Sequence, residues 1–368
     1  MPPADPPTAK AGRVPVTDYG GHLRPFYHDG KTYLFGLAHP DWLDPVANAK
    51  ALDNAAFWWV VDDDPRSGLR PAVRRARMSS RYAAVVPFYL NNHPYIFGLH
   101  SGSGDFGHGS VGANIWRIND DPSTGFTLVM YGHKMSVDYP HVLSFQLDGQ
   151  PYILGLHKDV GANIWRVKET PDGVTMQLVK YGATMSPNYR HLEVFYLDGH
   201  PYIFGAHLTT YASGANIWRV KDDPAQGLDL VTEGAAFPPS YDFVRSFHVA
   251  GRPYLFASVH DERTIPTSKV ELGLAIAKGL LKSDWSGIYE PGKGYGVIWA
   301  IASPRSPTIR RITPKAVPHS DRYTNMITFE QRGKAYIVGV HEEEYVNIWR
   351  VDDDPTRGFT LEYYGRDP

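Results

Sequence analysis

The chain contains no cysteine, and none of its apolar runs is long enough to span a bilayer. The lack of thiols excludes disulfide bridges and thiolate metal ligands. The formal net charge is only −2, so no basic field favours nucleic acid or an anionic membrane as a partner. The opening residues, MPPADPPTAKAGR, lack the apolar segment of a signal peptide. We therefore expect a soluble, cytoplasmic protein with a disordered tail over 1–13.

The sequence does contain a repeated phrase, at a period of roughly 50 residues, which is a spacing typical of propellers. It reads HPYIFGLH at 93–100, QPYILGLH at 150–157, HPYIFGAH at 200–207 and KAYIVGVH at 334–341. One phenylalanine near the start of each unit divides the chain into six units, at Phe26, Phe88, Phe145, Phe195, Phe247 and Phe329. Each unit has four short segments rich in β-branched and aromatic residues, and several units separate them by Asp-Gly or Asp-Pro turns.

Four antiparallel strands in each of six units predict an all-β fold. We expect a single six-bladed β-propeller over 14–368, with four-stranded antiparallel blades and short helical insertions on one face. Two segments compete to complete the last blade and close the ring: RVPVTDYGG near the start of the chain and FTLEYYG near its end.

Three units carry extra residues between their second and third strands, at 40–56, 101–112 and 261–296. Asp44 and Pro45 are typical of a helix start, and Ser268 with Glu271 forms a capping-box pattern. The amphipathic segment that follows predicts a helix over 268–285. The insertions could cover a ligand site in the channel, or the 268–285 helix could bind a partner or form a homodimer contact.

Residues that occur in every unit are expected to build the blades. One tryptophan recurs at the same place in each unit, and a ring of identical aromatics favours packing between blades. These residues are Trp59, Trp116, Trp165, Trp218, Trp299 and Trp349. The Asp-Pro segments lack the ligand spacing of a calcium loop and are interpreted as turns.

Histidines end the second strand of each unit and form a first ring of candidate binding residues. They are His39, His100, His157, His207, His260 and His341. Neutral imidazole is a common metal ligand, so several histidines near one axis could bind a ligand or a metal. Their occurrence in every unit equally favours a structural hydrogen-bond network within each blade.

A second ring differs from unit to unit, four residues before each anchor phenylalanine. It reads His22, Ala84, His141, His191, Phe243 and Asn325. These residues begin the innermost strands and should face the central channel. Three histidines with an open fourth position suit a divalent transition metal such as Fe, Zn, Cu or Mn. A water-filled mouth, or imidazoles that bind a ligand directly, fits the same pattern.

Acid-base residues accompany these histidines. Glu193 follows His191 by two residues, Arg24 follows His22 by two, and Tyr189 precedes His191 by two. Side chains two apart on a strand share a face, so Glu193, Arg24 and Tyr189 are candidate catalytic residues for proton transfer. Glu193 and Arg24 could instead form a salt bridge across the channel.

Three functions fit this sequence. The first is an enzyme with a histidine-lined, metal-dependent or acid-base site at the channel mouth, acting on a small molecule. The second is a multivalent lectin, suggested by NIWR at 114–117, 163–166, 216–219 and 347–350. The third is a protein-interaction scaffold. No phosphate loop, dinucleotide fingerprint or nucleophile elbow is present, so we expect no nucleotide cofactor.

Overall fold

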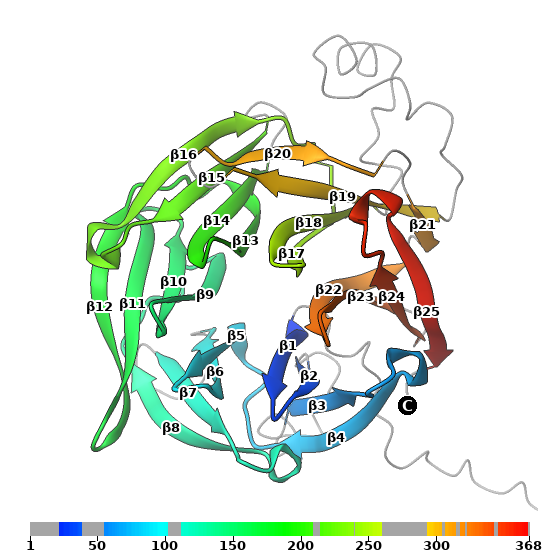
Figure 1. The fold of residues 1–368 in the computed structure, drawn as a ribbon. Helices are drawn as coiled ribbons and strands as arrows, with labels where there is room; N and C mark the ends of the chain where they lie inside the picture. Colours follow the sequence, from blue (N-terminus) through cyan, green and yellow to red (C-terminus); the bar gives the residue numbers. More distant parts are fainter. Residues whose placement is uncertain are drawn as a thin grey trace, which may run out of the picture.

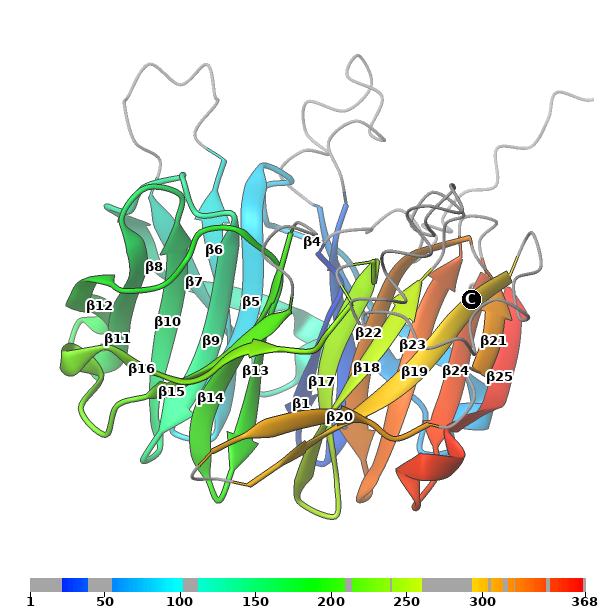
Figure 2. The same cartoon turned by 90° about the horizontal axis from the view of Figure 1, so that it is seen from above.

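The computed structural model describes residues 22–38, 55–101, 112–208, 214–238, 240–259, 293–303, 306–313, 317–320, 322–341 and 345–366. These residues form six sheets around a central axis (Figure 1). Viewed at right angles, the strands run through the thickness of the ring (Figure 2). The predicted six-bladed propeller with four-stranded antiparallel blades is therefore confirmed. None of the described helical turns has the length and hydropathy of a membrane span.

Each blade is made of consecutive strands, with the first strand innermost. Blade 1 contains β1 (Arg24–His28), β2 (Lys31–Leu37), β3 (Ala56–Val61) and β4 (Leu69–Ala76). Blade 2 contains β5 (Tyr82–Leu90), β6 (His93–His100), β7 (Ala113–Ile118) and β8 (Phe126–His133). Blade 3 contains β9 (His141–Leu147), β10 (Gln150–His157), β11 (Gly161–Thr170) and β12 (Gly173–Ala183).

The second half of the ring follows the same order. Blade 4 contains β13 (Tyr189–Leu197), β14 (His200–His207), β15 (Ala215–Val220) and β16 (Leu228–Ala235). Blade 5 contains β17 (Phe243–Val249), β18 (Arg252–Val259), β19 (Lys293–Ala302) and β20 (Thr308–Arg311), and β21 (Val317–Ser320) also pairs with β19. Blade 6 contains β22 (Tyr323–Gln331), β23 (Lys334–His341), β24 (Tyr345–Val351) and β25 (Phe359–Arg366).

Ring closure uses no shared strand among the described residues. The segment FTLEYYG is β25 and completes blade 6 from its own end of the chain, whereas RVPVTDYGG lies outside the described residues. Blades 6 and 1 are joined by side chains instead. Gln331 Nε2 donates to the carbonyl oxygen of Asp62 at 2.9 Å, and Arg332 forms an ion pair with Asp63 at 3.1 Å.

The predicted helical insertions are not borne out. The helical elements among the described residues are short 3-10 turns, and most of 40–56, 101–112 and 261–296 lies outside those residues, as does the 268–285 segment. The described strands overlap the ends of two insertions. β3 starts at Ala56, which pairs with Leu37, and β19 starts at Lys293, which pairs with Ser320.

The Asp-Pro turns are confirmed. They form the 3-10 turns η3 (Pro65–Ser67), η4 (Pro122–Thr124), η5 (Pro224–Gln226) and η8 (Pro355–Arg357). The carboxylate of the preceding aspartate accepts a hydrogen bond from the backbone N–H two residues later in each of them, as in Asp121 with Ser123 at 2.9 Å. This cap satisfies a donor that would otherwise lack a partner.

The anchor phenylalanines and the repeated tryptophans form the core. Each anchor is stacked on the tyrosine opposite it in the second strand, with ring centroids 5.0–5.6 Å apart in all six blades. The six tryptophans are 2–8% exposed. Trp165 of blade 3 lies in the apolar cluster that contains Phe88 and Tyr95 of blade 2. The predicted packing of tryptophans between blades is confirmed.

Candidate functional site

The repeated phrase builds a buried hydrogen-bond network inside the blades. In blade 3, Asn163 Nδ2 donates to the hydroxyl of Tyr139 at 2.6 Å, and the backbone N–H of Gly182 donates to Asn163 Oδ1 at 2.7 Å. The Tyr139 ring lies over Gly155, where a Cβ atom would be only 2.7 Å from the ring. Matching asparagine–tyrosine pairs are Asn114 with Tyr82, Asn216 with Tyr189 and Asn347 with Tyr323.

This network explains the NIWR motif. The four asparagines are 3–8% exposed, and the tryptophans of the same strands are 4–6% exposed. Sugar-binding surfaces need accessible polar groups and aromatic faces, which these buried side chains do not offer. The motif therefore builds the blades, and it no longer supports repeated sugar pockets.

The histidines at the ends of the second strands lie beside the same tyrosines. His100 packs edge-on against Tyr82, His157 against Tyr139 and His341 against Tyr323, with ring centroids 5.2–5.5 Å apart. His207 lies over Tyr189 at 4.6 Å, and His39 and His260 lie outside the described residues. These contacts place the described members in the structural network, while a ligand-binding role for them stays a prediction.

Tyr189 belongs to this network rather than to the channel. Its side chain is 4% exposed, and its hydroxyl accepts hydrogen bonds from Asn216 Nδ2 at 2.9 Å and Trp218 Nε1 at 3.0 Å. In a regular strand Tyr189 and His191 would lie on the same face. The pairing is irregular between them, so here they do not. The structure therefore gives no support to Tyr189 as a proton-transfer group.

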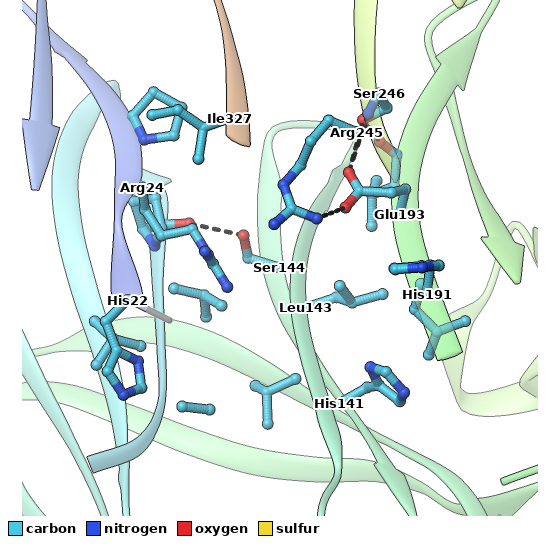
Figure 3. A pocket seen from close by; sticks show the side chains of 18 of the residues that line it. His22, Arg24, His141, Leu143, Ser144, His191, Glu193, Arg245, Ser246 and Ile327 are labelled. Carbon is cyan, nitrogen blue, oxygen red and sulfur yellow. Dashed lines mark hydrogen bonds and ion pairs between the residues drawn. The ribbon is translucent and has the colours of Figure 1, made fainter. Parts of the chain in front are cut away.

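The innermost strands line a central pocket of about 480 Å³, shown in Figure 3. We call the residues four before each anchor phenylalanine the mouth ring: His22, Ala84, His141, His191, Phe243 and Asn325. Two residues further along the strands lies the middle ring: Arg24, Val86, Leu143, Glu193, Arg245 and Ile327. Both rings contribute to the pocket wall. In the middle ring, charged side chains come from blades 1, 4 and 5 and apolar ones from blades 2, 3 and 6.

His141 and His191 are held by the neighbouring blades. His141 Nε2 lies 2.7 Å from the carbonyl oxygen of Tyr189, and His191 Nε2 lies 2.8 Å from that of Tyr241. A carbonyl only accepts, so both Nε2 atoms carry the proton. Burial lowers the pKa of His141 and lowers that of His191 to about 4. Both imidazoles are therefore neutral near pH 7, and each Nδ1 is a hydrogen-bond acceptor.

The predicted metal site receives no support from this arrangement. Within the described part of the chain, no group of three or more histidine, aspartate or glutamate side chains is placed to hold a metal ion. His22, His141 and His191 all line the pocket, but two of them already use Nε2 to bind the next blade. A metal held by these three residues stays a prediction.

Glu193 of β13 pairs with the neighbouring blade, a contact that the sequence did not reveal. Its carboxylate lies 3.4 Å from Arg245 Nη1 and accepts from the backbone N–H of Ser246 at 3.1 Å. Burial raises the pKa of Glu193, and Arg245 partly offsets that rise. Arg245 holds the same position after Phe243 that Glu193 holds after His191, so aligning all six units would have found this partner.

Arg24 lies on the opposite wall of the pocket from Glu193 (Figure 3). Its Nη1 donates to the carbonyl oxygen of Leu23 at 2.8 Å. Burial and then the like charge of Arg245 lower the pKa of Arg24 to about 10, so the group remains a cation near pH 7. Glu193 therefore forms its ion pair with Arg245 of the neighbouring blade, and among the described residues no ion pair joins Glu193 to Arg24 across the channel.

A third ring encircles the channel below the pocket, formed by the residue after each anchor phenylalanine. We call it the belt: Tyr27, Tyr89, Gln146, Tyr196, His248 and Glu330. At every junction, a side chain of one blade bonds the backbone of the next at this level. Gln146 N donates to the Tyr196 hydroxyl at 2.8 Å, and His248 N donates to Glu330 Oε1 at 2.9 Å.

The remaining four junctions of the belt are bridged in the same manner. Tyr27 N bonds Tyr89, Gln146 Nε2 bonds the Tyr89 carbonyl, Tyr196 N bonds His248, and Glu330 N bonds Tyr27. Innermost strands are sheet edges with unpaired backbone groups, and the belt satisfies part of that edge. The sequence signal was present, because each anchor phenylalanine is followed by a long polar or hydroxylated side chain.

Comparisons with known proteins show a similarity of fold alone. No family model matches the chain, and no curated protein matches its sequence. The lectin SapL1, solved with α-methyl fucoside, is similar at a TM-score of 0.52 and 6% identity, over 96% of this chain and 98% of that one. An Aleuria aurantia lectin variant, solved with Fucα1-6GlcNAc, is similar at 0.52 and 7% identity, over 93% and 94% of the two chains.

An exo-β-1,3-galactanase from Clostridium thermocellum is more distant, at a TM-score of 0.46 and 12% identity, over 93% of this chain and 79% of that one. At these identities the two lectins share the propeller architecture with this chain. The residues of the pocket have to be interpreted from their own geometry.

Proposed function

We propose that the channel mouth binds a small hydroxylated organic molecule of saccharide size and that the protein acts on it as an acid-base enzyme. The observation that carries this proposal is the pair of neutral imidazoles, His141 and His191. Each is fixed through Nε2 and keeps Nδ1 as an acceptor for a ligand hydroxyl. The pocket volume of about 480 Å³ lies within the usual range of small-molecule sites.

Glu193 supplies the proton-transfer group in this proposal. Burial raises the pKa of its carboxyl, which brings the group closer to the range in which acids and bases exchange protons near neutral pH. Its hydrogen bond from Ser246 N fixes one oxygen at 3.1 Å. The lectins of the same architecture make saccharides the first class of ligand to test.

The binding test uses ligand-observed NMR with fucose, galactose, glucose, galacturonate and glucuronate. Ala84→Trp places a large ring at the mouth, whereas Thr127→Trp places the same ring on the exposed outer strand β8. We expect wild type and Thr127→Trp to bind members of the panel and Ala84→Trp to lose binding at an unchanged melting temperature. Binding that survives Ala84→Trp, or silence across the panel, would overturn the proposed site.

The enzymatic part has a separate readout. Each bound compound is followed for conversion by proton NMR in the wild type and in Glu193→Gln. The proposal requires conversion in the wild type and its loss, with binding kept, in Glu193→Gln. Binding without conversion in the wild type would leave a binding protein and reject the enzyme.

A further inference from the structure

The two arginines of the middle ring hold equivalent positions and make the same backbone contact. Arg24 Nη1 donates to the carbonyl oxygen of Leu23 at 2.8 Å, and Arg245 Nη1 donates to that of Val244 at 2.8 Å. Each guanidinium thus folds back onto the residue before it. Arg245 therefore shows which hydrogen-bond acceptors an arginine at this position can have in the same protein.

The neighbours of the two arginines differ. Arg245 meets Glu193 of the preceding blade at 3.4 Å and Asn325 Oδ1 of the following blade at 3.3 Å. At the matching places around Arg24 stand Ile327 of blade 6 and Ala84 of blade 2. Neither side chain can accept a hydrogen bond.

The Arg24 guanidinium therefore has unused hydrogen-bond donors among the described residues. A guanidinium has five N–H donors, and the hydrogen bond to Leu23 is the one that Arg24 makes in that part of the chain. The middle ring holds two arginines and one glutamate, so the positive charges outnumber the negative one. Glu193 is hydrogen-bonded to Arg245 and attracts Arg24 only through space. A partly buried cation with unused donors on a pocket wall calls for an anion supplied from outside.

We propose that Arg24 binds the carboxylate of the ligand, and that the molecule taken up by the channel is therefore an acidic, hydroxylated compound. This inference rests on the proposed function and narrows its substrate class. A carboxylate matches the planar guanidinium in a two-bond geometry that an isolated Lys–anion contact would not provide. His141 and His191, across the pocket, accept hydrogen bonds from hydroxyl groups of the same molecule. Val86 and Leu143 form an apolar part of the pocket wall.

The test compares acidic sugars with their neutral counterparts and adds formate as the smallest carboxylate. Formate binding is followed by the ¹⁵N resonances of the Arg24 guanidinium in arginine-labelled protein. We expect saturable formate shifts at Arg24 in the wild type. We also expect galacturonate and glucuronate to bind about tenfold to a hundredfold more tightly than galactose and glucose.

The most informative variant gives Arg24 a hydrogen-bond acceptor from the protein itself. Ala84→Asp places a carboxylate at the position from which Asn325 contacts Arg245, and Ala84→Asn is its uncharged counterpart. Ala84→Asp should keep or raise the melting temperature while it abolishes formate shifts and the preference for acidic sugars. Arg24→Gln should lose the same preference, and Ala84→Asn should keep most of it.

The outcomes separate the two proposals. Neutral sugars that bind at the mouth as tightly as acidic ones, with no effect of Arg24→Gln, would overturn the carboxylate assignment and leave the site intact. Formate shifts at Arg24 without binding of any sugar would retain the anion contact and reject the saccharide. The absence of both formate shifts and sugar binding would overturn both.

Discussion

Scaffold residues and pocket residues lie on the same innermost strands, often only two to four positions apart. Tyr189 repeats in most blades and joins a buried network, whereas His191 and Glu193 change from blade to blade and line the pocket. A residue that recurs around the ring performs one local task in every blade. Residues that differ break the symmetry and can meet a ligand that itself has no six-fold symmetry.

The largest effect is expected from breaking the repeated side of this comparison. Asn163→Ala leaves the buried Tyr139 hydroxyl and the partly buried Gly182 N–H without their partner. We expect the free energy of unfolding to fall by about 3 kcal/mol, measured by urea denaturation. Asn119→Ala is the matched control, because the Asn119 side chain bonds the exposed residues Thr124 and Thr127, and it should cost less than about 1 kcal/mol. Equal losses for the two variants would argue against a structural network.

The second-largest effect is expected at His191, one of the residues that differ from blade to blade, and it depends on pH. The pKa of His191 falls from 6.5 to about 4 through burial, so the unfolded chain binds the proton more readily than the folded one. Stability from this residue is therefore present at pH 7 and is lost as the pH falls from about 6.5 towards 4. We expect wild type to lose about 2 kcal/mol more than His191→Phe between pH 7 and 4.5. A ring-proton titration of His191 near 6.5 would contradict this.

A smaller effect is expected from converting one arginine environment into the other. Glu193→Gln removes the carboxylate from Arg245 and makes that arginine resemble Arg24. Unfolding free energy should fall by about 1 kcal/mol, since both side chains are about one-fifth exposed, and formate should bind at a second site. Asp64→Asn, in an exposed pair with Arg66, is the control and should change neither quantity. Unchanged formate stoichiometry in Glu193→Gln would show that loss of the carboxylate does not create an anion site.

The smallest effect is expected on the outer strands. Tyr181 of β12 is 64% exposed, so Tyr181→Ser removes little buried area. Its free energy of unfolding should stay within about 0.5 kcal/mol of wild type, and binding at the channel should not change. A large loss in urea denaturation would indicate that the outer strands carry more of the scaffold than their exposure suggests.

The sequence predicted the architecture well because repetition multiplies a weak local signal. Six similar units, four of which carry close copies of one phrase, indicated the four-strand unit, the tight hairpin turns and the tryptophan positions, and all of these agree with the structure. The element boundaries beside the insertions were less well predicted. Strand pairing there extends to Lys293, opposite Ser320, and to Ala56, opposite Leu37, and periodicity does not encode these contacts between strands.

The candidate site was only partly accessible from the sequence. Arg24, Glu193 and His191 were placed on the channel wall by register alone, and the pocket contains all three. The carbonyls that bind His141 and His191 could not be predicted, because the backbone of Tyr189 and Tyr241 belongs to the next blade. Arg245, the partner of Glu193, was missed although it holds the matching position in blade 5. Tyr189 was misplaced because an irregularity after it changes the face on which the following residues lie.

Ring closure without a shared strand among the described residues means that the chain could connect the same blades from a different starting point. Because each described blade is assembled from consecutive strands, cutting the chain between blades severs no sheet. The connection 134–140 between β8 and β9 is one such place. A circular permutant that starts there, with the original ends joined, should keep the same blades, the same belt and the same pocket in a rearranged sequence.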